Sequence, residues 1–174
     1  QGDILQAKNP THGDVKSITL MPGNLTECYT EVVRAFNLAD RFMQPVFVLL
    51  DETIGHMAGK VVLPPLSEIE KNRVFRKRFD GDKKEYLPYG AKDDEPAVLN
   101  PMFEGYRYHF TGLHHGPTGH PTEDAVVCSA LMSRLFKKVE NHTDELELNE
   151  EYMIEDADIL IIAYGSVSLG AKEA

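Results

Sequence analysis

The sequence has few cysteines, no long apolar run and no excess of positive charge. Its 174 residues include two cysteines, Cys28 and Cys128, which are too few for a disulfide framework or a four-cysteine metal site. Each lies inside an apolar helical pattern, so we expect buried thiols in a protein of the reducing cytoplasm. No apolar run approaches the roughly 20 residues that cross a bilayer, so the sequence predicts no transmembrane span.

Negative charge predominates and is unevenly distributed. Lys and Arg number 18 against 28 Asp and Glu, a formal net charge of −10. Residues 140–174 hold ten of the acids against Lys172, so the rest of the chain is nearly neutral. This balance argues against a nucleic-acid-binding surface. The one basic cluster, residues 71–78, is interpreted either as a solvated connecting segment or as a docking patch for an acidic partner protein.

Residues 17–51 form the clearest structural unit. The apolar runs at residues 17–21 and 46–50 predict two buried parallel strands, the second covered on both faces. Between them the sequence predicts a helix, which Asn24 and Glu27 can cap and which Gln44-Pro45 ends. Its expected buried face consists of Leu25, Cys28, Tyr29, Val32, Val33, Phe36, Ala39 and Phe42. Strand, helix and strand of these lengths predict a right-handed βαβ unit, so the fold class is α/β.

The remainder of the chain is less regular. Residues 61–105 show little periodicity and predict a linker or a functional excursion. Residues 106–111 alternate as an edge strand does. Thr122 can cap a helix over residues 123–139, whose expected inner face consists of Val126, Val127, Ala130, Leu131, Leu135 and Phe136. The apolar run at residues 158–164 predicts a further buried parallel strand, followed by the start of a helix at Gly165-Ser166. Because that helix has so few residues, we expect the chain to be one piece of a longer polypeptide.

Two groups of residues could carry chemistry. Asp51 and Glu52 follow the second strand at its carboxyl end, where ligands bind in open parallel sheets, although acids there also serve as solvation or caps. Four of the seven histidines fall within residues 109–120, where three imidazoles could reach a zinc ion. Adjacent histidines rarely share one metal, and no carboxylate or cysteine completes the set. We therefore interpret this stretch as a shaped loop.

An ordered series of motifs resembles a known family. Gln1-Gly-Asp3, Thr11-His-Gly-Asp14, Ala35-Phe-Asn-Leu-Ala-Asp40 and Leu49-Leu-Asp-Glu-Thr-Ile-Gly-His-Met57 follow one another, and Gly105-Tyr-Arg-Tyr-His-Phe-Thr-Gly-Leu-His114 and Ala157-Asp-Ile-Leu-Ile-Ile-Ala-Tyr-Gly-Ser166 agree later. The series closely resembles the α subunit of 2-oxoacid:ferredoxin oxidoreductases, especially the 2-oxoglutarate-type enzymes, over nearly the whole chain.

The resemblance implies a fold, a cofactor and partners. In that family thiamine diphosphate lies between the α subunit and a β subunit, which holds the diphosphate and Mg²⁺. Residues 1–60 then correspond to the latter half of a pyrimidine-binding domain, residues 61–154 to a connecting region, and residues 155–174 to the start of a transketolase-C-like α/β domain. With two cysteines, the iron–sulfur clusters are expected on partner chains. The family's threonine–proline motif and cofactor-activating glutamate would precede Gln1, so we expect this chain alone to be inactive.

The resemblance also implies an activity and a set of site residues. The reaction is the oxidative decarboxylation of a 2-oxoacid, with 2-oxoglutarate the first choice, to an acyl-coenzyme A, with electrons passed to ferredoxin. Many relatives carry an arginine before Thr-His-Gly that grips the substrate carboxylate. Lys8 takes that place, with Lys16 a less favoured substitute, and lysine keeps the charge but loses the bidentate fork.

Further residues are expected near the same reaction. Thr11 and His12 would line the substrate site, although His12 also fits a plain turn histidine. Asp51, Glu52 and His56 would face the cofactor or a subunit interface. The alternative function is a non-catalytic α/β binding or scaffold module derived from such a subunit.

Overall fold

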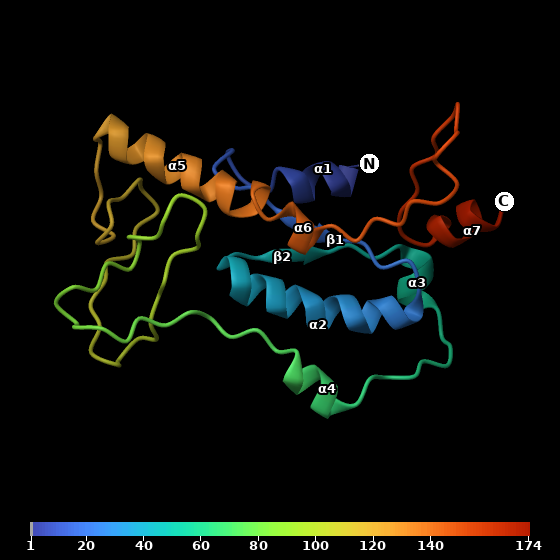
Figure 1. Ribbon diagram of the computed structural model, residues 1–174, viewed down its shortest axis with the longest axis horizontal. Coiled ribbons are helices and arrows are strands. Elements are labelled where there is room, and N and C mark those ends of the chain that lie inside the picture. The colour runs from blue at the N-terminus through green and yellow to red at the C-terminus, as the bar shows by residue number, and fades with distance from the viewer. Residues whose placement is uncertain (1) are drawn as a thin grey trace.

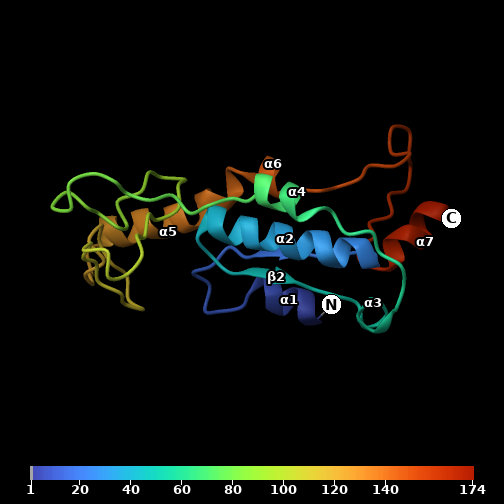
Figure 2. The same cartoon turned by 90° about the horizontal axis from the view of Figure 1, so that it is seen from below.

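A two-stranded parallel sheet forms the centre of the fold. The computed structural model describes residues 2–174, so Gln1 of the opening motif lies outside the described residues. Strand β1 (Ile18–Leu20) pairs with β2 (Val46–Val48), with Ile18 opposite Val46. Helices α1 (Gly2–Lys8) and α2 (Leu25–Phe42) lie on opposite faces of these strands (Figures 1 and 2). The α/β class and the strand–helix–strand order are confirmed.

The capping of α2 agrees with the sequence. The Glu27 backbone N–H donates to Asn24 Oδ1 at 3.0 Å, and the Glu27 carboxylate accepts from the Gly23 N–H at 2.7 Å. The helix ends at Phe42, where Met43 adopts a left-handed conformation with φ of 50°. Both ends are therefore determined by local chemistry that the sequence makes visible.

The buried face of α2 is narrower than predicted. Ala35, Leu38 and Phe42 are buried, whereas Phe36 is 74% exposed and Val32 is also exposed. Two short strands can cover only a narrow stripe of a helix, so the outer part of the apolar face stays in solvent. Although helices lie on both faces of the strands, they cover β2 incompletely, and it is half-buried along its length rather than buried as expected.

Helix α5 (Ala125–Glu140) completes the core from a distant part of the sequence. Its Val139 is buried together with Ile18, Leu20 and Phe42. Asp124, rather than the expected Thr122, caps the helix, because the N–H groups of Val126 and Val127 donate to Asp124 Oδ1 at 3.0 and 2.9 Å.

The inner face of α5 also differs from the apolar face that the sequence predicted. Val126 is 78% exposed, while Arg134 and Lys138 are buried. Cys128 on this helix and Cys28 on α2 are free and half-buried, so the expectation of fully buried thiols is wrong.

Two predicted strands are absent from the described residues. Residues 106–111 run without a strand, because side chains rather than a ladder hold this part of the chain. Residues 158–164 also form no strand, and Ile159 and Ile162 are each 83% exposed. A strand needs a neighbour to satisfy its backbone, and none among residues 2–174 pairs with this run. Both strand predictions are wrong for this structure.

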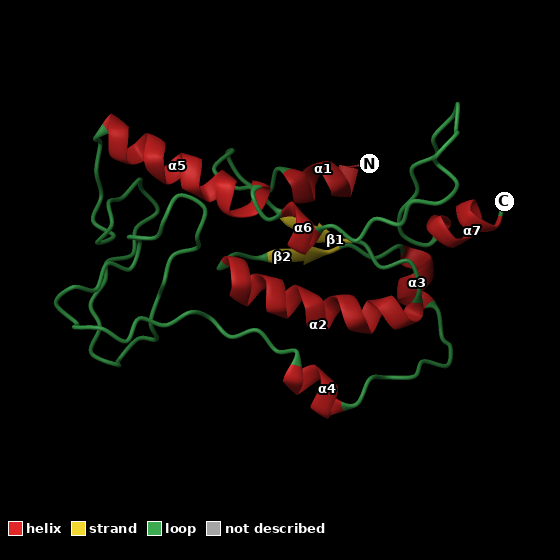
Figure 3. Cartoon of the chain, in the orientation of Figure 1, coloured by secondary structure: helices red, strands yellow, loops and turns green. Residues whose placement is uncertain are grey.

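Short helices complete the described chain. They are α3 (Glu52–His56), α4 (Leu66–Lys71), α6 (Thr143–Leu146) and α7 (Val167–Glu173), the last where the sequence predicted a helix start. Loop dominates between α4 and α5 (Figure 3). None of the helices among residues 2–174 is long and apolar enough to cross a membrane. The proposed domain boundaries at residues 60 and 154 stay a prediction.

The basic cluster of residues 71–78 is partly neutralised by acids of the same chain. Arg76 pairs with Asp40 at 2.6 Å, Lys77 with Glu95 at 2.7 Å, and Arg78 with Glu104 at 3.1 Å. These ion pairs favour the interpretation of the cluster as a solvated connecting segment.

Candidate functional site

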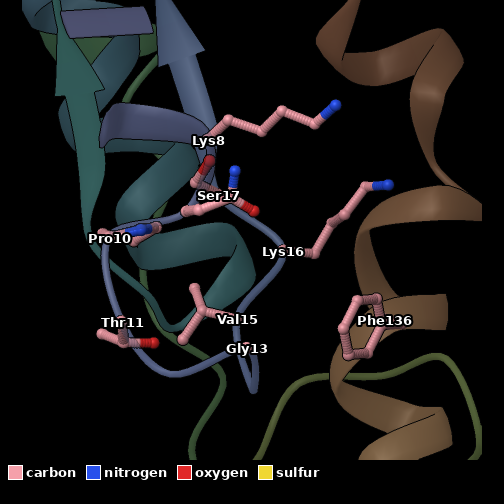
Figure 4. A pocket seen from close by; sticks show the side chains of 9 residues that line it. Lys8, Pro10, Thr11, Gly13, Val15, Lys16, Ser17 and Phe136 are labelled. Carbon is pink, nitrogen blue, oxygen red and sulfur yellow. The ribbon is translucent and has the colours of Figure 1, made fainter. Parts of the chain in front are cut away.

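The loop between α1 and β1 borders a cavity with a volume of about 190 Å³. Helix α1 ends at Lys8, and Gly13, with φ of 114°, lets the chain turn back toward β1. Lys8, Thr11 and Lys16 line one side of the cavity, and Phe136 of α5 lines the other. Figure 4 shows the Lys8 side chain, at the end of α1, and the Lys16 side chain, in the loop, both extending toward α5. Segments far apart in sequence therefore enclose a positively charged space.

The two lysines of this cavity differ in their partners. Lys16 Nζ donates to Glu140 Oε1 at 3.0 Å, and the Lys16 carbonyl accepts from Gln44 Nε2 at 3.0 Å. For Lys8 Nζ, no carboxylate or other acceptor lies within hydrogen-bonding distance among residues 2–174. The ammonium of Lys8 is consequently the group in this cavity that can take up an added anion without breaking an ion pair.

The structure separates the predicted site residues into two groups. Lys8 and Thr11 share the cavity, whereas His12 is exposed on the same loop and is not among the lining residues. Asp51 and the α3 residues Glu52 and His56 follow β2 and so stand at the other end of the parallel strands from the loop that precedes β1 (Figure 1).

Asp51 has a defined partner in the carboxyl-terminal part of the chain. Its Oδ2 accepts from the Ser166 N–H at 2.5 Å, and this hydrogen bond lowers the pKa of the Asp51 carboxyl group. Gly165, with φ of 63°, makes the approach possible, because a Cβ there would lie 2.5 Å from Asp51 Oδ2. Asp51 thus anchors the turn before α7, while Glu52 and His56 are exposed.

The histidine-rich stretch is a packed loop. His109 and His120 stack with ring centroids 4.9 Å apart, and His115 packs edge-on against Tyr89 at 4.3 Å. In the part of the chain that the structure describes, no three His, Cys, Asp or Glu side chains gather closely enough to hold a metal ion. These contacts agree with the interpretation of a shaped loop.

The sequence reasoning missed two cations inside the protein. Arg134 and Lys138 lie four residues apart on the buried face of α5 and line a second cavity. The signal was present in the sequence, since the two positions share a helical face with Leu131 and Leu135.

Comparisons with known proteins agree on one family. Residues 1–134 match the family model described as pyruvate flavodoxin/ferredoxin oxidoreductase, thiamine diphosphate-binding. The 2-oxoglutarate synthase subunit KorA of Methanothermobacter thermautotrophicus is 36% identical over 175 residues, covering 100% of this chain and 46% of that protein. Subunit alpha of 2-oxoacid:ferredoxin oxidoreductase 1 from Aeropyrum pernix is 30% identical over 182 residues, covering 100% of this chain and 27% of that protein.

A solved structure shares the fold of the described chain. It is a 2-oxoglutarate:ferredoxin oxidoreductase from Magnetococcus marinus with 2-oxoglutarate, coenzyme A and succinyl-CoA bound. Its TM-score is 0.85 at 28% sequence identity, covering 99% of this chain and 30% of that one. The chain therefore spans less than half the length of these relatives.

Proposed function

We propose that this chain, which belongs to the pyruvate flavodoxin/ferredoxin oxidoreductase thiamine diphosphate-binding family, is part of the α subunit of a 2-oxoglutarate:ferredoxin oxidoreductase. The enzyme decarboxylates 2-oxoglutarate, passes the electrons to ferredoxin and transfers the acyl group to coenzyme A. The 36% identity with 2-oxoglutarate synthase subunits over the full chain supports this substrate over other 2-oxoacids. The ketoisovalerate oxidoreductase subunit VorB of Methanothermobacter marburgensis is 26% identical.

The cavity bordered by Lys8 is the proposed site for a substrate carboxylate. A carboxylate entering it would meet an ammonium that has no acid partner among the described residues, and the hydroxyl of Thr11 lines the same space. Charge-assisted hydrogen bonds of this kind are about twice as strong as neutral ones. Lys16 is the weaker candidate, because binding an anion there competes with Glu140. The substrate site rests on the observation that the Lys8 ammonium has no acid partner among residues 2–174.

The cofactor and partner assignments rest on the family. Thiamine diphosphate, when bound, would supply the nucleophilic carbon on which decarboxylation of a 2-oxoacid depends. We assign its diphosphate and Mg²⁺ to a β-type subunit and the iron–sulfur clusters to partner chains in a cytoplasmic assembly. Glu52 and His56 are exposed at the carboxyl end of β2, where they could contact the cofactor or that subunit. Asp51 accepts from the Ser166 N–H and so anchors the turn before α7.

Kinetics of the full assembly test the role of Lys8. Lys8→Ala should raise KM for 2-oxoglutarate about 10- to 100-fold, because one charge-assisted hydrogen bond is lost, while the dependence on ferredoxin and coenzyme A stays unchanged. Lys8→Arg should retain most of the affinity, since it keeps the charge. Lys60→Ala, an exposed lysine outside the cavity, is the matched control.

The outcomes separate the substrate site from the family function. An active assembly in which Lys8→Ala leaves kcat/KM unchanged removes Lys8 from the site but keeps the proposed reaction. An intact assembly of the unmodified protein with no 2-oxoacid oxidation would instead support the non-catalytic scaffold.

A further inference from the structure

A second cavity, of about 160 Å³, lies between α5 and the loops that precede it. Apolar side chains such as Leu99 and Leu131 form much of its lining, and Arg134, Lys138 and His115 supply the polar groups. Arg134 is 7% exposed and Lys138 is 6% exposed, so both cations are among the most buried residues of the described chain. Burial of a charge is expensive unless a partner compensates it.

Neither buried cation is compensated by an acid of the described chain. Lys138 Nζ donates to the Phe42 carbonyl at 3.0 Å, and Arg134 donates to the Glu95 carbonyl at 3.4 Å. Both acceptors are neutral backbone groups, and no carboxylate among residues 2–174 lies within 4.0 Å of either cation. The Glu95 carboxylate is instead paired with Lys77 at 2.7 Å.

The lack of compensation has a measurable consequence for Lys138. Burial, with a further contribution from the neighbouring Arg134, lowers the pKa of Lys138 to about 8. At neutral pH the cavity therefore still carries two positive charges in an environment of low polarity. Such a space attracts an anion more strongly than a pair of surface lysines does.

His115 adds a third polar group, one of whose ring nitrogens has no hydrogen-bond partner among the described residues. Its Nδ1 lies 3.0 Å from the Leu113 carbonyl, a contact that requires a proton on Nδ1. Its Nε2 is buried and has no hydrogen-bond partner among the described residues. Buried polar atoms in proteins nearly always have a partner, so Nε2 is the ring nitrogen that is available to a ligand in this cavity.

We propose that Arg134, Lys138 and His115 form a binding site for a small phosphate-class oxyanion. The two cations supply donors for the anion, and His115 Nε2 can accept from a protonated phosphate oxygen or, as an imidazolium, donate to it. The cavity volume corresponds to roughly ten water-sized spheres, which leaves room for one such anion. This site lies apart from the Lys8 cavity, with which it shares no lining residue, and does not depend on the proposed reaction.

A purely structural role for the cations predicts something different. Lys138 holds the end of α2 through the Phe42 carbonyl, and Arg134 holds the loop at Glu95. If that were their whole role, added phosphate would have no effect beyond that of ionic strength. Titration with phosphate therefore separates the two interpretations.

The test is calorimetric titration of the full-length polypeptide with inorganic phosphate at pH 7 and constant ionic strength. Saturable binding to one site is expected, and Arg134→Met should weaken it about 10- to 100-fold through loss of a charge-assisted hydrogen bond. Lys137→Met, an exposed neighbour on the same helix, should leave the affinity unchanged. Absence of binding, or equal affinity in Arg134→Met, overturns the proposal.

A second measurement needs no variant. In a histidine-edited ¹H–¹⁵N spectrum of the unmodified protein, phosphate should shift the His115 Nε2 resonance with the same saturation as the heat signal. An unshifted Nε2 resonance at saturating phosphate overturns the assignment of His115 to the site. A parallel titration with adenosine 5′-monophosphate distinguishes a free ion from the phosphate group of a larger ligand. Tighter binding of inorganic phosphate indicates a site for the free ion, and tighter binding of the nucleotide indicates a site for a larger ligand.

Discussion

The βαβ unit of residues 18–48 and the irregular segment of residues 79–108 are held together by different kinds of interaction. In the βαβ unit, ladder hydrogen bonds join β1 to β2, and apolar side chains gather around Phe42, which is fully buried. In the irregular segment no ladder forms, and a few polar side chains bond directly to the backbone.

Asn100 is the centre of the irregular segment. Its side chain accepts from the Phe79 N–H at 2.8 Å and donates to the Phe79 carbonyl at 2.7 Å, as a strand neighbour would. The Asn100 N–H donates to Tyr86 Oη at 2.8 Å, and Tyr108 Oη donates to the Asn100 carbonyl at 3.0 Å. Asn100 is 2% exposed. One amide thus replaces a strand pairing.

The difference concerns how stability is distributed. Apolar burial is non-directional and summed over many contacts, so a change in the βαβ unit is felt across the whole unit. Hydrogen bonds to one buried amide are directional and few, so a change there should open the segment locally. Three substitutions and one change of pH test this contrast.

Phe42→Ala should have the largest effect. Removing a fully buried phenyl ring costs about 3–5 kcal/mol of unfolding free energy, because apolar contacts are lost and a cavity remains. Urea denaturation measures the loss, and hydrogen exchange should show protection falling throughout residues 18–48. Phe36→Ala is the control, since its ring is 74% exposed and should change stability by less than about 0.5 kcal/mol. A loss confined to the end of α2 would contradict the picture of a shared core.

Asn100→Ala should follow, with a loss of about 2–4 kcal/mol. The substitution leaves the N–H and carbonyl of Phe79 without partners in a part-buried place, and each unsatisfied group costs roughly 1–3 kcal/mol. Amide exchange should accelerate at Phe79 and its neighbours while residues 18–48 keep their protection. Asn149→Ala, in an exposed loop, serves for comparison. Loss of protection in β1 and β2 as well would show that the two regions unfold together.

Lys138 lies where the two regions meet, and its contribution to the unfolding free energy should depend on pH. The folded pKa of about 8 is below the value of 10.5 in the unfolded chain, so the unfolded state holds one more proton between these limits. The unfolding free energy should therefore rise with pH across that window, by an amount on the order of 1–3 kcal/mol from this group.

Denaturation at pH 7.5 and 9.5 tests the pH effect. The rise should be present in the unmodified protein and in Lys137→Met but absent from Lys138→Met. Identical pH slopes in all three proteins would show that Lys138 ionises normally in the fold.

Tyr86→Phe should have the smallest effect, about 1–2 kcal/mol. The ring keeps its packing against Phe79 and Tyr106, and only the hydroxyl that joins Val98 to Asn100 is lost. A double-mutant cycle with Asn100→Ala should show coupling, because both side chains serve one network. Additive losses would mean that Tyr86 and Asn100 act independently.

Much of the fold could be predicted because it depends on neighbours in sequence. The Asn24 cap, the end of α2 near Pro45 and the strand–helix–strand order all follow from residues within one or two turns of each other. The alternation at residues 106–111 and the apolar run at residues 158–164 both predicted strands that do not form, and the reason is the same for both. A strand exists only where another strand accepts its hydrogen bonds, and no local pattern reveals whether one is present.

The candidate site divides in the same way. The amino-acid sequence sufficed for the α/β class, the family and the position of Lys8 and Thr11 just before β1, since these depend on residue order and local chemistry. The three-dimensional arrangement was needed to show that Phe136 lines the other side of that cavity, that Glu140 pairs with Lys16 rather than with Lys8, and that Asp51 accepts from the Ser166 N–H. These contacts join residues more than a hundred positions apart. The first two depend on how α5 packs against the sheet and the third on where the turn before α7 lies, and no local interaction specifies either.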